Sequence, residues 1–118
     1  MPDRDREDPS LFLDDILGAL ERILMFTSEM TFSDFHRDIK TQDAVIRNLE
    51  IMGEAVKNLP ESCKELHPEV PWARMAAMRD KLIHHYFGVS LAITWTTVKE
   101  DLPRIRPVLL KIREKLRE

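Results

Sequence analysis

The sequence has little of what several protein classes require. Among its 118 residues it has one cysteine, Cys63, so it can form no internal disulfide and no cysteine-based metal site. It has only three glycines, which favours helices over a sandwich or a barrel. No apolar run approaches the length of a membrane span, and residues 1–8 lack the basic start and apolar centre of a signal peptide. We therefore expect a cytoplasmic protein with no membrane partner.

Several kinds of site are missing as well. No glycine-rich loop could cradle the phosphates of a nucleotide, and no signature surrounds a serine nucleophile. His84 and His85 are adjacent and would point about 100° apart on a helix. No third histidine or carboxylate lies at the spacing of a metal ligand. We therefore expect neither a metal site nor a cofactor.

What the sequence does contain is the pattern of one helical domain. Charged residues make up 33% of the chain and hydrophobic residues 43%, and the net charge of −3 does not by itself indicate a nucleic-acid partner. Apolar residues recur at helical spacing in four long stretches, which predicts an all-α, up-and-down bundle of four long helices with short connecting helices. The expected ranges are a flexible leader at 1–8, one domain at 9–118, long helices at 9–30, 41–59, 71–87 and 91–116, a turn or short helix at 31–38, and a short helix at 61–66.

The last stretch has an apolar register that passes through two prolines, Pro103 and Pro107. Because a proline lacks the N–H group and kinks a helix, we expect two nearly coaxial helices or one bent helix. The apolar spacings alternate between four and three residues, in the set Leu91, Trp95, Val98, Leu102, Ile105, Leu109, Ile112 and Leu116.

Residues 72–88 carry the least ordinary combination in the chain. Arg79 lies in the middle of an apolar helical stripe, so it must be paired, must extend its charge to the surface, or must face a cleft. His84 and Tyr86 follow near the predicted helix end, which Gly88 marks. The stripe consists of Trp72, Met75, Ala76, Leu82, Ile83 and Tyr86.

Arg79, His84 and Tyr86 form the pattern R-x4-H-x-Y, which resembles the signature of the HepT-like toxins, a branch of the HEPN ribonucleases. Further segments resemble the same family: R-x-x-E-x-x-G-E-A at 47–55, P-x-[IV]-P-W at 68–72, and D-L-P at 101–103 preceded by a tryptophan. The resemblance extends over nearly the whole chain. It implies a HEPN-like dimeric bundle and a partner, a minimal nucleotidyltransferase antitoxin of the MntA type.

The chemistry open to these residues is metal-independent acid–base catalysis on RNA, which supplies its own 2′-hydroxyl nucleophile. His84 could transfer a proton, and Arg79 could hold the phosphate oxygens as charge develops. Such transesterification gives a 2′,3′-cyclic phosphate. From the residues alone, a partly buried structural histidine is the favoured interpretation of His84, and the resemblance reverses this in favour of the catalytic role.

Geometry adds a constraint on this pair. On a straight helix Arg79 and His84 diverge by about 140° and rise by about 7.5 Å. They can act on one phosphate if the helix loosens near its end or if two copies of the chain face each other. The resemblance implies the second arrangement, a homodimer with a shared cleft.

Tyr86 could end the core stripe with its hydroxyl in water. The resemblance instead implies that the antitoxin attaches AMP to this tyrosine, which would block the cleft and inactivate the toxin.

A second polar set lies on the helix at 41–59. Arg47, Glu50 and Glu54 fall within one arc with Asp43. This arc is either a solvated face with an Arg47–Glu50 ion pair or a surface that supports the active cleft or meets a second subunit.

The favoured function is therefore the toxin of a type VII-like toxin–antitoxin pair, an endoribonuclease. Two alternatives remain: a non-catalytic HEPN module that binds a nucleotide or a nucleotidyltransferase, and a helical dimerisation domain in which Arg79 pairs with Glu50 or Glu54.

Overall fold

The computed structural model describes residues 8–84 and 90–117, without the side chain of His84. Within these ranges the chain is helical and contains no strand, which confirms the all-α prediction. The elements are α2 (Pro9–Thr27), α3 (Phe32–Arg37), α4 (Ile39–Asn58), α5 (Glu61–Leu66), α6 (Trp72–His84), α7 (Leu91–Thr96), the π-helical segment η2 (Thr97–Asp101) and α8 (Leu102–Leu116).

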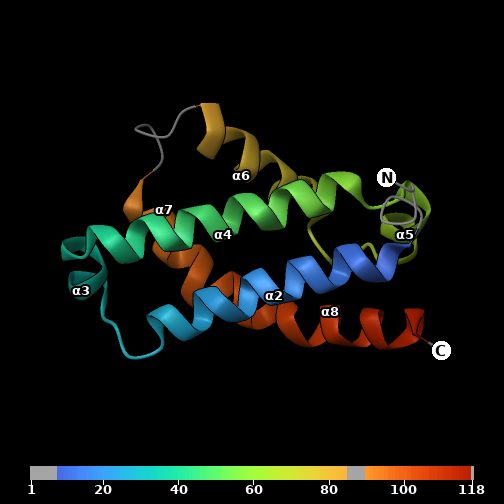
Figure 1. Ribbon diagram of the computed structural model, residues 1–118, viewed down its shortest axis with the longest axis horizontal. Helices are drawn as coiled ribbons and strands as arrows, with labels where there is room; N and C mark the ends of the chain where they lie inside the picture. The colour runs from blue at the N-terminus through green and yellow to red at the C-terminus, as the bar shows by residue number, and fades with distance from the viewer. Residues whose placement is uncertain (1–7, 85–89, 118) are drawn as a thin grey trace.

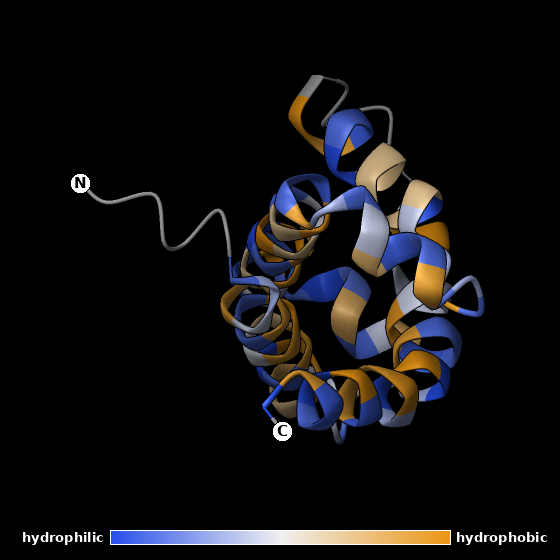
Figure 2. Ribbon diagram, turned by 90° about the vertical axis from the view of Figure 1, so that its right-hand side faces the viewer, coloured by the Kyte–Doolittle hydropathy of each residue, from blue (hydrophilic) through white to orange (hydrophobic). Residues whose placement is uncertain are grey.

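The long helices alternate in direction, as an up-and-down bundle requires (Figure 1). α4 packs against α2 on one side and α6 on the other, and α2 also packs against α8. The short helix α3 lies at one end of the bundle against α4 and α7, and α5 lies at the opposite end. Figure 2 shows hydrophobic and hydrophilic residues alternating around the helices, as in amphipathic helices that enclose a core.

Local capping sets where α2 and α4 begin. Asp8 accepts a hydrogen bond from the backbone N–H of Ser10, so α2 begins at Pro9 as predicted. Asp38 accepts from the N–H of Thr41, and this cap starts α4 at Ile39, two residues before the predicted start. None of the described helices is both long and apolar enough to cross a membrane.

The C-terminal run is one bent succession of helices, and its bend is the π-helical turn η2 rather than either proline. Pro103 lies in the first turn of α8, and Pro107 lies inside α8 without ending it. Because a π turn bonds i to i+5, it shifts the inner face. Ahead of it Thr94 is fully buried, while Leu91 and Trp95 of the predicted stripe are only partly buried and still pack against the core. Trp95 packs on Phe35 of α3, with ring centroids 5.0 Å apart.

Candidate active site at the α4–α6 crossing

The helix that carries the motif begins at Trp72, one residue later than predicted. The Trp72 indole N–H donates to the backbone carbonyl of His67, which fixes the start of α6 against the preceding loop. Leu82 is buried as the stripe predicted, but Ile83 is 44% exposed, and that part of the prediction is wrong. The reason is that the last turn of α6 diverges from α4 (Figure 1).

The structure describes the three motif residues to different extents. Arg79 lies within the described part of α6. His84 is the last residue of α6, and the placement of its side chain lies outside the described part, as does all of Tyr86. The structure therefore tests the surroundings of Arg79 and leaves the roles of His84 and Tyr86 as predictions.

Arg79 lies where α6 comes closest to α4. A Cβ atom placed on Gly53 would lie 2.1 Å from the Cβ of Arg79 and 3.0 Å from the carbonyl oxygen of Met75. Real atoms do not approach so closely, so only glycine at position 53 permits this crossing. The residue that approaches Gly53 this closely is the motif arginine.

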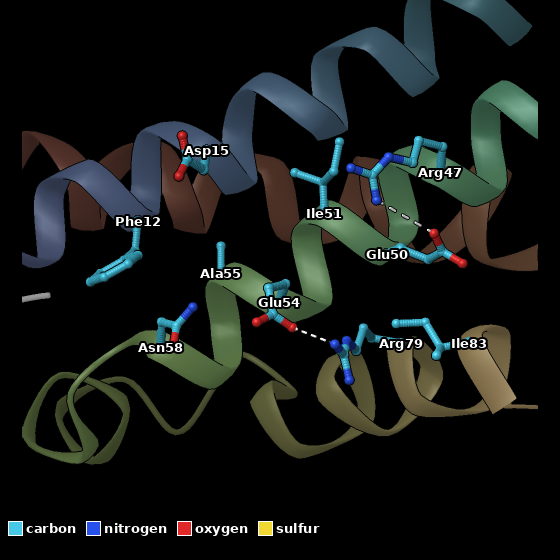
Figure 3. A pocket seen from close by; sticks show the side chains of 10 residues that line it. All are labelled: Phe12, Asp15, Arg47, Glu50, Ile51, Glu54, Ala55, Asn58, Arg79 and Ile83. Carbon is cyan, nitrogen blue, oxygen red and sulfur yellow. Dashed lines mark ion pairs between the residues drawn. The ribbon is translucent and has the colours of Figure 1, made fainter. Parts of the chain in front are cut away.

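Two carboxylates hold the guanidinium of Arg79. Its Nη2 lies 2.7 Å from Oε2 of Glu54 on α4, and its Nη1 lies 3.0 Å from Oδ1 of Asp80, the next residue along α6 (Figure 3 shows the Glu54 pair). Lys57 reaches the same Asp80 oxygen at 2.9 Å. The pairing of Arg79 with Glu54, one of the two partners that the sequence offered, is thus present, and the four charges sum to zero.

The electrostatics of this network favour an ionised Asp80. The hydrogen bond from Lys57, followed by that from Arg79, lowers the pKa of the Asp80 carboxyl below its usual value of 3.8. Asp80 therefore stays negative at neutral pH and keeps its hold on Nη1.

Arg79 retains donors for a further ligand. A guanidinium has five N–H groups. The Nε–H is buried without a hydrogen-bond partner, and the two ion pairs engage one N–H on each terminal nitrogen. The side chain is 22% exposed, so the remaining terminal N–H groups can reach a ligand at the surface.

Beside Arg79 runs a groove of about 240 Å³ between α2, α4 and α6 (Figure 3). Arg47 and Glu50 form an ion pair at 3.6 Å on its wall, so the polar arc of α4 is both an ion-paired face and a lining of this groove. The lining residues are Phe12, Asp15, Arg47, Glu50, Ile51, Glu54, Ala55, Asn58, Arg79 and Ile83.

The sequence prediction missed several of these neighbours. Asp80 could have been found from its position beside Arg79, but its contact with Lys57 joins residues 23 positions apart and leaves no periodic signal. Phe12 and Asn58 come from α2 and from the end of α4, and only the packing of these helices brings them to the groove. In the described ranges no group of three or more His, Cys, Asp or Glu side chains could hold a metal ion.

Comparison with known proteins gives a consistent result. The family model described as ribonuclease HepT-like matches residues 16–112. A protein of Thermococcus cleftensis named "Probable ribonuclease HepT" is 56% identical over 103 residues, which are 87% of this chain and 94% of that protein. A protein of Methanocaldococcus jannaschii, also named as an RNase, is 53% identical over 98 residues, 83% of this chain and 81% of the relative. No solved structure matches the chain.

Proposed function

The chain belongs to the HepT-like ribonuclease family, and from that membership we propose that it is the toxin of a type VII-like toxin–antitoxin pair, a metal-independent endoribonuclease of the cytoplasm. The observation that carries this proposal is the position of Arg79. Its guanidinium is fixed by two carboxylates at the edge of a groove and keeps donors for a phosphate. The close crossing at Gly53 places the backbone of Arg79 against α4 and holds the side chain at the edge of this groove.

The proposed reaction is transesterification within the RNA. The 2′-oxygen attacks the adjacent phosphorus as its proton passes to a base, and the bond from phosphorus to the 5′-oxygen breaks. A proton passes to that oxygen, so the products are a 2′,3′-cyclic phosphate and a free 5′-hydroxyl. Arg79 stabilises the negative charge on the non-bridging oxygens, and His84 transfers a proton at the 2′- or 5′-oxygen.

The regularity of α6 supports action as a homodimer. The helix continues to His84 without a loosened turn, so Arg79 and His84 remain separated by about 140° and about 7.5 Å along the axis. Two chains facing each other would place an arginine of one beside a histidine of the other. Light scattering at micromolar concentration should give twice the mass of the chain, and a monomer would contradict this part of the proposal.

The experiment that tests the catalytic proposal is RNA cleavage by the purified protein in excess EDTA. We expect cleavage with cyclic-phosphate ends, and His84→Ala should lower its rate by about 10²–10⁴-fold. His85→Ala is the matched control, because it removes a neighbouring imidazole that is not part of the R-x4-H-x-Y pattern. Full activity of His84→Ala, or activity only with added metal, would contradict the mechanism. Binding of RNA without cleavage would favour the non-catalytic module.

The proposed control of the toxin is AMP attachment to Tyr86 by a nucleotidyltransferase antitoxin. Incubation with that enzyme and ATP should add AMP in whole units of mass, visible by intact-protein mass spectrometry. Tyr86→Phe keeps the ring but removes the hydroxyl, so it should gain no mass. A mass gain that persists in Tyr86→Phe would place the modification on another residue.

A further inference from the structure

We propose that the end of the groove away from Arg79 is a base-binding subsite. It would receive a nucleobase that flanks the cleaved phosphate and would favour the amino-bearing bases adenine, cytosine and guanine over uracil. The subsite rests on the proposed ribonuclease function, and it concerns residues that the catalytic proposal does not use: Asn58, Ala55, Ile51 and Phe12.

The two ends of the groove differ in charge. The cations that line it, Arg47 and Arg79, belong to the end where Arg79 meets Glu54 (Figure 3). Asn58 and Asp15 line it as well, and Asn58 is the last residue of α4, where the helix dipole is negative. A phosphate would be repelled from that end, whereas a neutral group with N–H donors would be attracted.

The Asn58 side chain supplies the polar group for such a contact. It is exposed, lines the groove and makes no hydrogen bond to any other described residue. Its amide oxygen can accept from an exocyclic amino group. Adenine, cytosine and guanine carry that group, whereas the one N–H donor on the pairing edge of uracil lies between two carbonyl oxygens. The negative end of α4 would repel these oxygens, so the site would discriminate against uridine.

Apolar side chains complete the subsite. Phe12 lies at the Asn58 end of the groove, and Ala55 and Ile51 line it toward the cationic end, so a flat base can pack against this apolar wall (Figure 3). The volume of about 240 Å³ lies below the range of pockets for drug-sized ligands, which suits one base better than a larger ligand. Asn58 lies four residues after Glu54, about 6 Å along α4, so a base beside it belongs to the nucleotide whose phosphate meets Arg79 or to the next one.

The test uses DNA oligonucleotides that each contain a single ribonucleotide, because cleavage can then occur only beside that 2′-hydroxyl. The base on either side of the cleaved phosphate is varied in turn among A, C, G and U, and single-turnover rates are compared in EDTA. At one of these two positions, the three amino-bearing bases should be cleaved about tenfold faster than uracil, the value of one net hydrogen bond. Equal rates for all four bases at both positions would overturn the subsite.

Asn58→Ala should bring the rates on the amino-bearing bases down toward the rate on uracil. Ser62→Ala is the matched control, since Ser62 is an exposed polar residue at the same end of the bundle that does not line the groove. A preference unchanged in Asn58→Ala would overturn the assignment. A change of oligomeric state in this variant, with the preference intact, would show that the surface meets a protein instead.

Binding of non-cleavable 2′-O-methyl oligonucleotides separates this proposal from the ribonuclease proposal. Tighter binding of the amino-bearing bases, lost in Asn58→Ala, would support the subsite even if the protein cut none of the substrates. Cleavage that shows no base preference, together with equal affinities, would remove the subsite and leave the ribonuclease function standing.

Discussion

The two neighbours of α4 bury very different amounts of their surface. α2 contributes seven side chains with at most 2% exposure, namely Leu13, Ile16, Leu17, Ala19, Leu20, Ile23 and Thr27. In the described part of α6 only Leu82 is enclosed to that degree, while Arg79 remains 22% exposed and Ile83 44%. The stabilising and the functional roles are therefore divided between the two helices. Packing on α2 stabilises the bundle, and α6 can carry charged groups because it contributes less to the core.

The strongest test of this division is Arg79→Ala. Loss of the guanidinium should lower the cleavage rate by about 10²–10⁴-fold. The unfolding free energy should change by less than about 1 kcal/mol, because partly exposed ion pairs contribute little. Cleavage kinetics and urea denaturation measure the two effects. Arg74→Ala, on the exposed face of the same helix, should change neither, and unfolding of Arg79→Ala would mean that α6 is also a structural element.

Leu20→Ala should show the opposite behaviour. Leu20 has no exposed surface, so truncation should lower the unfolding free energy by about 2–5 kcal/mol through lost burial and a residual cavity. Cleavage per folded molecule should stay near that of the parent chain. Met25→Ala on the same helix is the control, because Met25 is 66% exposed and should change stability by less than about 0.5 kcal/mol. A large loss of activity in folded Leu20→Ala would break the comparison.

Two glycine-to-alanine substitutions should change the free energy of unfolding in opposite directions. Gly53→Ala forces α6 away from α4, so it should cost about 1–3 kcal/mol and also reduce cleavage by displacing Arg79. Gly18→Ala places a Cβ only 3.5 Å from the Arg22 side chain, an ordinary contact, so it should stabilise α2 by about 0.5–1 kcal/mol. Thermal unfolding of both variants measures the direction of each change. A Gly53→Ala variant more stable than the parent chain would show that α6 can move away from α4 without cost.

The smallest expected effect is on the stability of the fold at acidic pH. Asp80 has a pKa below 3.8 in the folded chain, so its ionised form adds stability above that pH, and the contribution is lost as pH falls through the folded pKa. Asp80→Asn should therefore weaken the pH dependence of the urea midpoint below about pH 4. Lys57→Met removes the main cause of the shift and should act in the same direction. An unchanged profile in both variants would mean that the pair has no effect on folding.

Prediction from sequence succeeded where signals are local. The predicted bounds of α5, 61–66, and the predicted helix start at residue 91 both agree with the structure, where the Ser90 side chain caps α7. Helical spacing places Arg79 on the apolar stripe and leaves two candidate partners, Glu50 and Glu54. Predicting that Arg79 pairs with Glu54 would require the crossing angle of α4 and α6. The exposure of Ile83 could not be predicted because it depends on where the two helices diverge. The dimer and the roles of His84 and Tyr86 stay predictions.

The π-helical turn η2 has a consequence for how this chain can tolerate mutation. The extra residue in the turn lets one continuous run present Trp95 to α3 while α8 packs on α2. A single-codon deletion between Thr97 and Asp101 would convert the turn to an ordinary α-helical one and bring both faces into a single phase. One of the two contacts would then be lost, whereas a conservative missense change in the same segment would preserve both. In this segment the number of residues is therefore more strongly constrained than their identity.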